Sequence, residues 1–91
     1  EIILVLRRLP SQVQREIFGD MIRRARNRLG LTQENLAELM SCSAHWIHKV
    51  ERGKSDLNWM DTLHLTVILD LDPAKILEEV GTHAPVPSNR K

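Results

Sequence analysis

The chain of 91 residues has little of several features that small proteins use for stability or chemistry. One cysteine excludes an internal disulfide framework and suits a reducing compartment. Three aromatic residues leave leucine, isoleucine, valine and methionine to fill the core. Since no apolar run is long enough to span a bilayer, we expect no membrane segment and a cytoplasmic location. The length suits one small domain.

Residues for catalysis or metal binding are also sparse. No serine–histidine–acid order, glycine-rich phosphate loop or carboxylate pair predicts catalysis, so we expect neither an enzyme nor a cofactor. Cys42, His45 and His48 have a helical spacing that would suit zinc or copper. The stronger interpretation is that Cys42 faces inward as a small apolar side chain, and no metal site is predicted.

The net charge of +1 conceals a division of charge along the chain. Residues 15 to 54 carry eight basic and five acidic side chains, whereas residues 55 to 80 carry one basic and six acidic side chains. Such a division favours contact with a polyanion through one face only. Runs of charged residues are often only solvent-exposed surface, so the charge division alone does not predict binding to a polyanion and the sequence motifs are needed as well.

Capping signals divide the chain into five predicted helices. Residues of the N-cap type precede apolar side chains at helical spacing at Ser11, Thr32, Ser43 and Asn58. Gly30 and Gly53 stand where glycines end the first and third helices. The first helix is predicted to run from Ser11 to about Leu29, the fourth to begin at Trp59, and the fifth to open at Pro73.

The apolar spacing predicts which side chains face the core. In the first three helices these are Val13, Ile17, Phe18, Met21, Ile22, Ala25, Leu36, Ala37, Met40, Ile47 and Val50. In the last two they are Trp59, Leu63, Thr66, Ile68, Leu69, Ile76 and Leu77. Gly19 interrupts the first helix and is a weak point that would split it in two.

The two ends lack such periodicity. Ile2–Leu6 is an uninterrupted β-favouring run, interpreted either as a strand that pairs with another chain or as an apolar arm on the helices. Residues 1–10 are therefore assigned to an N-terminal arm, 11–80 to the helical domain and 81–91 to a flexible tail.

Three stretches carry a family resemblance. They are Ile22-Arg23-x-x-Arg26, Gly30-Leu31-Thr32-Gln33-x-x-Leu36-Ala37 and Ser43-x-x-x-Ile47-x-x-Val50-Glu51-Arg52-Gly53-Lys54. On these residues, the segment from Phe18 to Leu77 resembles the phage-repressor type of helix-turn-helix domain, the Cro-type or XRE family. The resemblance implies an all-α, five-helix, lambda-repressor-like fold that binds DNA as a dimer, usually to repress transcription.

Carried over residue by residue, the resemblance implies roles for the motif's polar positions. Ala44, His45 and Lys49 would lie on the outward side of a recognition helix, residues 44–52, and contact base edges. Contacts to the DNA backbone would come from Gln33, Ser43, Trp46, Arg52 and Lys54. Arg26 and Glu51 would form a structural ion pair between the first and third helices.

The chain departs from the family pattern at four positions. Ser41 replaces the usual turn glycine, and a left-handed conformation there would cost serine a little. Ala44 and Trp46 replace polar readers of DNA. Asp56 places a negative charge in the loop that should face phosphate.

We therefore predict a sequence-specific DNA-binding regulator, a nucleoid-associated repressor that acts as a homodimer. Val67, near Leu71 and Val80, is a candidate for the dimer patch. One alternative is an antitoxin that binds DNA in the same way and neutralises a toxin through Ile2–Leu6. Another is a protein-interaction module that has lost DNA binding, which Asp56 and Ala44 favour.

Overall fold

The computed structural model describes the backbone of residues 11–82 and the side chains of residues 12–79. This part is all-α, as predicted, with five helices: α2 (Ser11–Arg28), α3 (Gln33–Met40), α4 (Ala44–Glu51), α5 (Trp59–Ile68) and α6 (Pro73–Thr82). The predicted arm, with Ile2–Leu6, lies outside the described residues, and so does the predicted tail beyond its first two residues. Within the described range, no helix combines the length and apolar character needed to cross a membrane.

Local capping sets most of the helix ends, as the sequence predicts. The side chains of Thr32, Ser43 and Asn58 each accept a hydrogen bond from a backbone amide in the first turn of α3, α4 and α5. Gly30 and Gly53 have positive φ angles of 74° and 71°, a conformation that favours glycine. These caps and turns depend on residues close in sequence, so they fix the helix ends locally.

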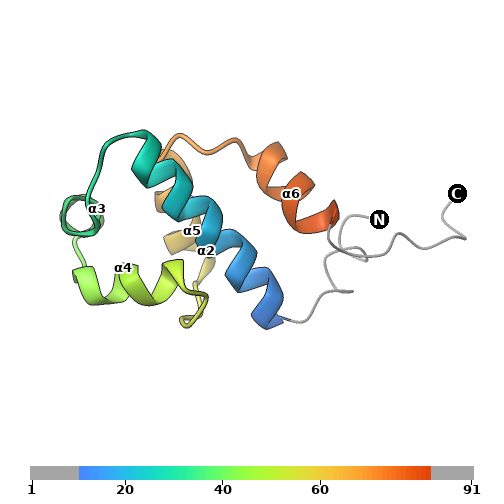
Figure 1. Ribbon diagram of the computed structural model, residues 1–91, viewed down its shortest axis with the longest axis horizontal. Coiled ribbons are helices and arrows are strands. Elements are labelled where there is room, and N and C mark those ends of the chain that lie inside the picture. The colour runs from blue at the N-terminus through green and yellow to red at the C-terminus, as the bar shows by residue number, and fades with distance from the viewer. Residues whose placement is uncertain (1–10, 83–91) are drawn as a thin grey trace, which may run out of the picture.

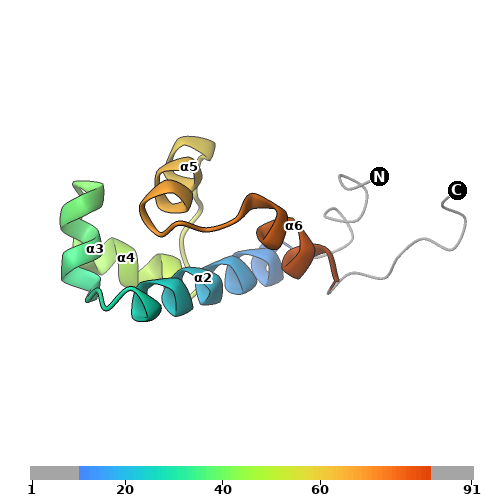
Figure 2. The same ribbon diagram turned by 90° about the horizontal axis from the view of Figure 1, so that it is seen from above.

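The long helix α2 organises the rest of the molecule (Figure 1). Helix α3 lies near the C-terminal end of α2, whereas α4 runs along the lower edge of the view with its last turn against the middle of α2, and α6 lies on the right of α2. Seen from above, α5 stands to one side of α2 (Figure 2). Among the helices that the structure describes, none covers the outer side of α4.

The core lies where α2, α3, α4 and α5 meet. Its buried members are Ile22, Ala25, Leu36, Ala37, Ile47, Val50, Leu65 and Leu69. The interpretation of Trp59 as a core residue is wrong, because its side chain is 70% exposed. Leu63, which was also predicted to face the core, is exposed, and Leu65 is buried in its place. Apolar residues surround much of α5, so their spacing alone did not identify its inner face.

Gly19 does not split the first helix, which runs unbroken from Ser11 to Arg28. Its role is to allow close packing, since a Cβ atom there would lie 2.4 Å from the backbone oxygen of Val50 and 2.7 Å from that of Glu51. Such distances are impossible for a real side chain. Glycine therefore lets α2 touch the last turn of α4 backbone to backbone.

Candidate nucleic-acid interface

The turn between α3 and α4 is short and held by its own backbone. Ser41 adopts the left-handed conformation, with φ 56° and ψ 46°, as expected for the residue that replaces a glycine. The amide of Cys42 donates to the carbonyl oxygen of Ala37 at 2.9 Å, and the amide of Ser41 donates to that of Glu38. This closed turn fixes the direction in which α4 leaves α3.

One face of helix α4 is buried against the core, and the opposite face is exposed to solvent. Ile47 and Val50 are buried in the core, which fixes the rotation of the helix about its axis. His45, His48 and Lys49 are exposed. Since residues three and four apart share one side of a helix, these three side chains form a polar ridge on the outer face of α4.

A buried polar network locks the end of α4 to the two preceding helices. Arg26 on α2 binds the carboxylate of Glu51 through two nitrogens, at 2.6 Å and 3.1 Å. It also donates to the carbonyl oxygen of Leu31, just before α3. Gln33, the first residue of α3, donates to the same carboxylate at 3.1 Å. The Arg26 and Glu51 side chains are only 11% and 3% exposed, so water hardly screens this pair.

The segment after α4 is held against the start of α2. A Cβ atom on Gly53 would meet Glu16 at 2.7 Å, so this contact also requires glycine. Gln12 donates to the carbonyl oxygen of Gly53 at 3.0 Å. The amide of Lys54 donates to the carbonyl oxygen of Lys49 at 2.8 Å. Arg52 and Lys54 are exposed on either side of this anchored glycine.

The acidic residue of this segment has a partner. Asp56 lies 2.9 Å from the guanidinium of Arg15, although its own side chain is 90% exposed. A positive charge at that distance offsets part of the repulsion that Asp56 would exert on a phosphate. The departure from the family pattern at this position is therefore partly compensated within the fold.

The basic side chains differ in whether an acidic side chain of the protein already pairs with them. On α2, Arg23 and Arg24 pair with Asp20, and Arg24 also pairs with Glu79 of α6 at 2.8 Å. Burial opposes the effect, but the hydrogen bonds and charges of Arg23 and Arg24 hold the pKa of Asp20 below its usual value. The hydrogen bond to Glu79 raises the pKa of Arg24.

By contrast, three cations on and after α4 have no acidic partner within 4 Å among the described side chains. They are Lys49, Arg52 and Lys54, and all three are exposed. Positive charge that is not neutralised within the protein is available to an anionic ligand. Arg28 on α2 and Lys75 on α6 are also exposed without an acidic partner, so three of the five unpaired cations among the described residues gather at the open side of α4 and the segment that follows it.

The comparison with known families agrees with this geometry. Residues 17–78 match a family described as a helix-turn-helix domain, and the match spans more than half of the chain. The chain belongs to the helix-turn-helix family. Its membership indicates a DNA-binding regulator, since such domains place their second helix in the major groove. A search among curated proteins finds no match to this chain.

The helix-turn-helix geometry brings most of the sequence-predicted site residues together. The predicted ion pair between Arg26 and Glu51 is present in the fold. Ser43 caps α4 and is exposed. Gln33 uses one amide hydrogen on Glu51 and keeps a second donor, so a phosphate contact there stays a prediction.

Two residues that were predicted to contact DNA are less exposed than the others. Ala44 and Trp46 are half-buried and pack against the core. Trp46 shares a hollow with Met40, Cys42 and Asp61, which lie on the α3 turn and on α5. Its side chain therefore lines a space between α3, α4 and α5, and the backbone contact to DNA assigned to it stays a prediction.

The turn cysteine has the inward position predicted for it. Cys42 is half-buried and packs against the core. Burial raises the pKa of its thiol, and the charge of Asp61 adds to the effect. In the described part of the chain, no three His, Cys, Asp or Glu side chains gather in a way that would hold a metal ion.

Sequence reasoning missed Gly19, Arg15 and Gln12 as supports of this interface. Gln12 and Arg15 hold the segment after α4, and Gly19 sets the distance between α2 and α4. Their partners lie more than thirty residues away in the sequence. No local pattern marks such pairs.

Proposed function

We propose that this protein is a sequence-specific transcriptional regulator of the phage-repressor type, which binds DNA as a dimer and represses transcription without any catalytic step. The observation that carries the proposal is the open, cation-bearing side of α4, held in place by the Arg26–Glu51–Gln33 network. A rigid recognition helix needs such support because a small misplacement would lose base contacts.

Affinity in this proposal comes from the phosphates. Lys49, Arg52 and Lys54 are exposed and carry no acidic partner among the described side chains. Each cation that neutralises a phosphate releases a counterion, so affinity falls as salt rises. The anchoring of Gly53 on Glu16 would keep Arg52 and Lys54 in register with the DNA backbone.

Sequence choice would come from fewer side chains. His45 and Lys49 lie one turn apart on the outer face of α4, and both are exposed. Lys49 suits the acceptor pair of a guanine, and His45 offers a donor or an acceptor to a base edge. Ala44 adds only its small exposed surface, which suits a thymine methyl group.

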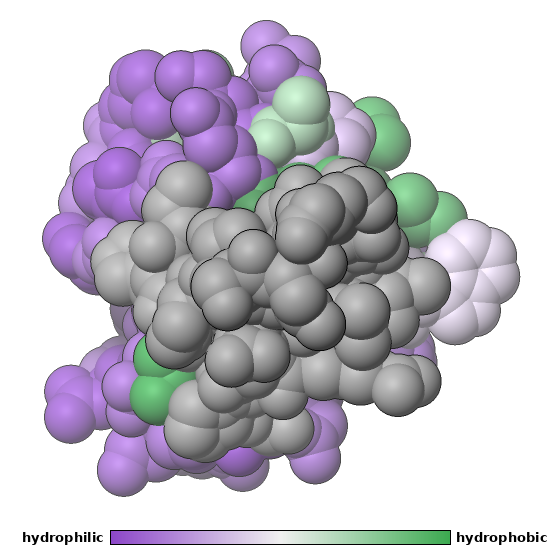
Figure 3. Space-filling view, turned by 90° about the vertical axis from the view of Figure 1, so that its right-hand side faces the viewer, coloured by the Kyte–Doolittle hydropathy of each residue, from purple (hydrophilic) through white to green (hydrophobic). Residues whose placement is uncertain are grey.

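A second copy of the chain is the proposed partner at α5. Trp59, Met60, Leu63 and Val67 are exposed and fall within one arc of this helix, opposite the buried Leu65 and Leu69. Hydrophobic surface shows along the edge of the molecule toward which α5 lies (Figure 3). Such a stripe is typical of an interface, and a two-fold axis would pair it with itself.

This stripe replaces most of the dimer patch suggested by the sequence. Val67 is 76% exposed, as an outward position requires. Leu71, however, is half-buried and packs against the core, so it offers little free surface. The side chain of Val80 is outside the described residues.

Selection of bound duplexes from a random pool tests the proposal most directly. We expect an enriched, roughly palindromic site with half-sites about 10 base pairs apart, as a dimer with two recognition helices requires. Lys49→Ala should weaken binding to that site about tenfold or more and relax the base preference at one position of each half-site.

Phosphate contacts are tested by the salt dependence of binding. Arg52→Ala and Lys54→Ala should each weaken binding to all duplexes alike and lower the salt slope by about one unit. The matched control is Lys75→Ala, which removes an exposed cation from α6 and should leave the slope unchanged. If the unaltered protein selects no sequence and shows no salt-dependent binding to random duplex, the proposal is wrong.

That last outcome would favour a protein-interaction module that kept the fold and lost DNA binding. Asp56 is the residue that supports this alternative, since its carboxylate is largely exposed near the phosphate track. Its pairing with Arg15 and the three free cations weigh against it. We therefore retain DNA binding as the proposed function.

A further inference from the structure

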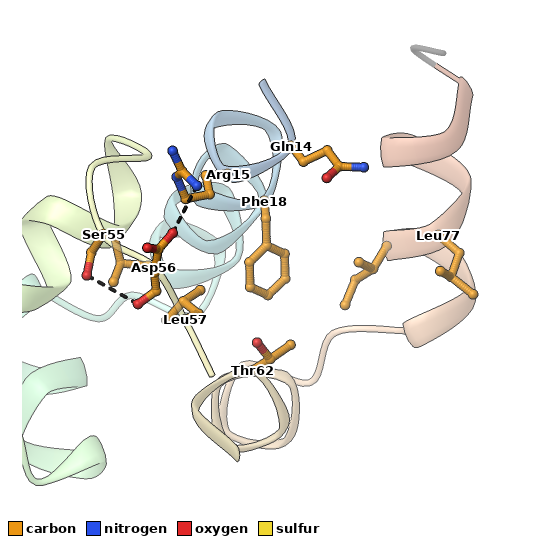
Figure 4. Close-up of a pocket in the computed structure, with 10 residues that line it drawn as sticks. Gln14, Arg15, Phe18, Ser55, Asp56, Leu57, Thr62 and Leu77 are labelled. Carbon is orange, nitrogen blue, oxygen red and sulfur yellow. Dashed lines mark hydrogen bonds and ion pairs between the residues drawn. The ribbon is translucent and has the colours of Figure 1, made fainter. Parts of the chain in front are cut away.

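A cleft of about 480 Å³ lies on the side of the molecule away from the α3–α4 turn. It opens between the first turns of α2, the segment of residues 55–57, α5 and α6. Its apolar walls are Phe18, Val50, Leu57, Ile76 and Leu77. Figure 4 shows the ring of Phe18 pointing into the space between Leu57 and Leu77, with Thr62 on the opposite side.

The described part of the protein leaves this cleft open. Leu77 is 40% exposed, and Phe18, Leu57 and Ile76 are only half-buried. The volume is within the range of cavities that hold a ligand or a peptide segment. An apolar hollow of this size on a small domain indicates that something apolar covers it.

The position of the cleft points to the preceding part of the chain. Gln14 and Arg15 lie on its rim, three and four residues after the start of α2 at Ser11. The chain therefore enters the helix within one turn of the cleft. Arg7–Pro10 would serve as a connector of up to about 13 Å, enough for the chain to reverse direction.

The chemistry of that preceding segment suits the cleft. Ile2–Leu6 is a run of five consecutive apolar residues, about 17 Å long when extended. It is followed by Arg7 and Arg8. Residues 55 to 80, which supply Asp56, Leu57 and Leu77 to the cleft, carry one basic and six acidic side chains in all, although Asp56 is already paired with Arg15 on the rim. Apolar side chains would thus meet apolar walls, and two cations would meet the acidic half of the molecule.

We propose that Ile2–Leu6 of the same chain packs into this cleft and completes the hydrophobic core. The short connector favours this occupant over a second copy, because tethering gives it a high effective concentration. Val50 and Leu57 form the cleft wall on either side of the segment that carries Arg52 and Lys54. Occupation of the cleft would therefore hold that segment, and removal of the arm by a competing partner would loosen it.

Paramagnetic NMR tests the proposal in the full chain without DNA, so its outcome is independent of the proposed function. A nitroxide is placed at Glu1→Cys in a Cys42→Ala background, which leaves the apolar run unaltered. We expect broadened methyl signals from Leu57, Ile76 and Leu77. The methyl signals of Leu39, exposed on α3, should stay sharp.

A pair of matched variants identifies the occupant. Ile3→Asp combined with Leu4→Asp should abolish the broadening and lower the melting temperature by about 4 °C or more, because neighbouring residues cover both faces of an extended segment. Ala84→Asp combined with Val86→Asp, which alters apolar residues after α6, should change neither. Unchanged methyl signals of Ile22 would show that the core remains folded.

Three results would overturn the proposal. The first is the absence of broadening in the spin-labelled chain. The second is the appearance of broadening in a mixture where spin label and isotope are on different chains, which would assign the cleft to a second copy. The third is loss of the broadening in the Ala84→Asp, Val86→Asp chain alone, which would assign it to the C-terminal segment.

Discussion

The two halves of this domain use charge and apolar surface in opposite ways. From α2 to the segment after α4, the protein buries an ion pair and exposes four cations, Arg28, Lys49, Arg52 and Lys54, that have no acidic partner among the described side chains. In α5 and α6 the net charge is negative and large apolar side chains such as Trp59 and Val67 are exposed. The first half thus suits a polyanion, and the second half offers the apolar surface that the proposed dimer would use, so the two contacts would not compete.

The largest expected effect comes from breaking the buried pair in the first half. Arg26→Met leaves the carboxylate of Glu51 buried and without its cation, and the free energy of unfolding should fall by about 3–5 kcal/mol. Denaturant unfolding measures the change. Arg23→Met, which removes an exposed arginine from the same helix, is the control and should cost less than about 1 kcal/mol.

A second variant tests whether the loss of stability comes from leaving the Glu51 carboxylate buried without a partner. Arg26→Met combined with Glu51→Leu removes both partners and should recover most of the lost stability. If the double variant is no more stable than Arg26→Met, the network contributes something other than the pairing of a buried charge.

The next largest effect should come from the backbone contact between α2 and α4. Gly19→Ala forces a methyl group into carbonyl oxygens that cannot move aside, and we expect a loss of about 2–3 kcal/mol in unfolding free energy. Gly30→Ala is the matched control, since nothing lies within 4 Å of its Cβ position and only its positive φ opposes the change. It should cost about 1 kcal/mol.

The second half is tested through association. Val67→Lys adds a charge to the centre of the exposed stripe on α5 and should weaken the proposed dimer about tenfold, or about 1.4 kcal/mol. Sedimentation at several concentrations measures this, and unfolding free energy of the monomer should change little. A monomeric unaltered protein at high micromolar concentration would contradict the dimer.

The smallest effect concerns the surface ion pairs that Asp20 forms with Arg23 and Arg24 within α2. Because the pKa of Asp20 is lowered in the folded state, its contribution is present above the unfolded value near 3.8 and is lost as pH falls through the folded value. Asp20→Asn should therefore be less stable than the unaltered protein at pH 7, and the difference should shrink as pH falls through the folded value of Asp20. Its size should stay under about 1 kcal/mol, because the carboxylate is half exposed.

The sequence predicted the features that depend on neighbouring residues. Thr32, Ser43 and Gly53 act within one turn of themselves, so their capping roles followed from residue type and spacing. The ion pair of Arg26 with Glu51 followed from the family resemblance. These predictions gave the helix-turn-helix and most of its polar surface.

Features that depend on how helices meet could not be predicted in this way. Trp59 and Leu63 belong to a helix with apolar residues on several faces, and the packing of α5 against the core decides which face is buried. Gly19 was interpreted as a weak point because its partners on α4 lie far away in the sequence. Trp46 likewise lines a hollow together with Asp61 of α5, and no local pattern of α4 could show that neighbour.

The buried network also has a consequence for the lifetime of the recognition helix. Capped helices form quickly from local contacts, whereas Arg26 and Glu51 are 25 residues apart and meet only when α2 and α4 dock. We expect this pair to form after the folding transition state, so Arg26→Met should speed unfolding in stopped-flow experiments and leave the folding rate nearly unchanged. A slower folding rate in that variant would place the docking earlier. If the pair forms late, as we expect, it lowers the unfolding rate and so sets how long the folded recognition helix persists, without changing how fast the domain folds.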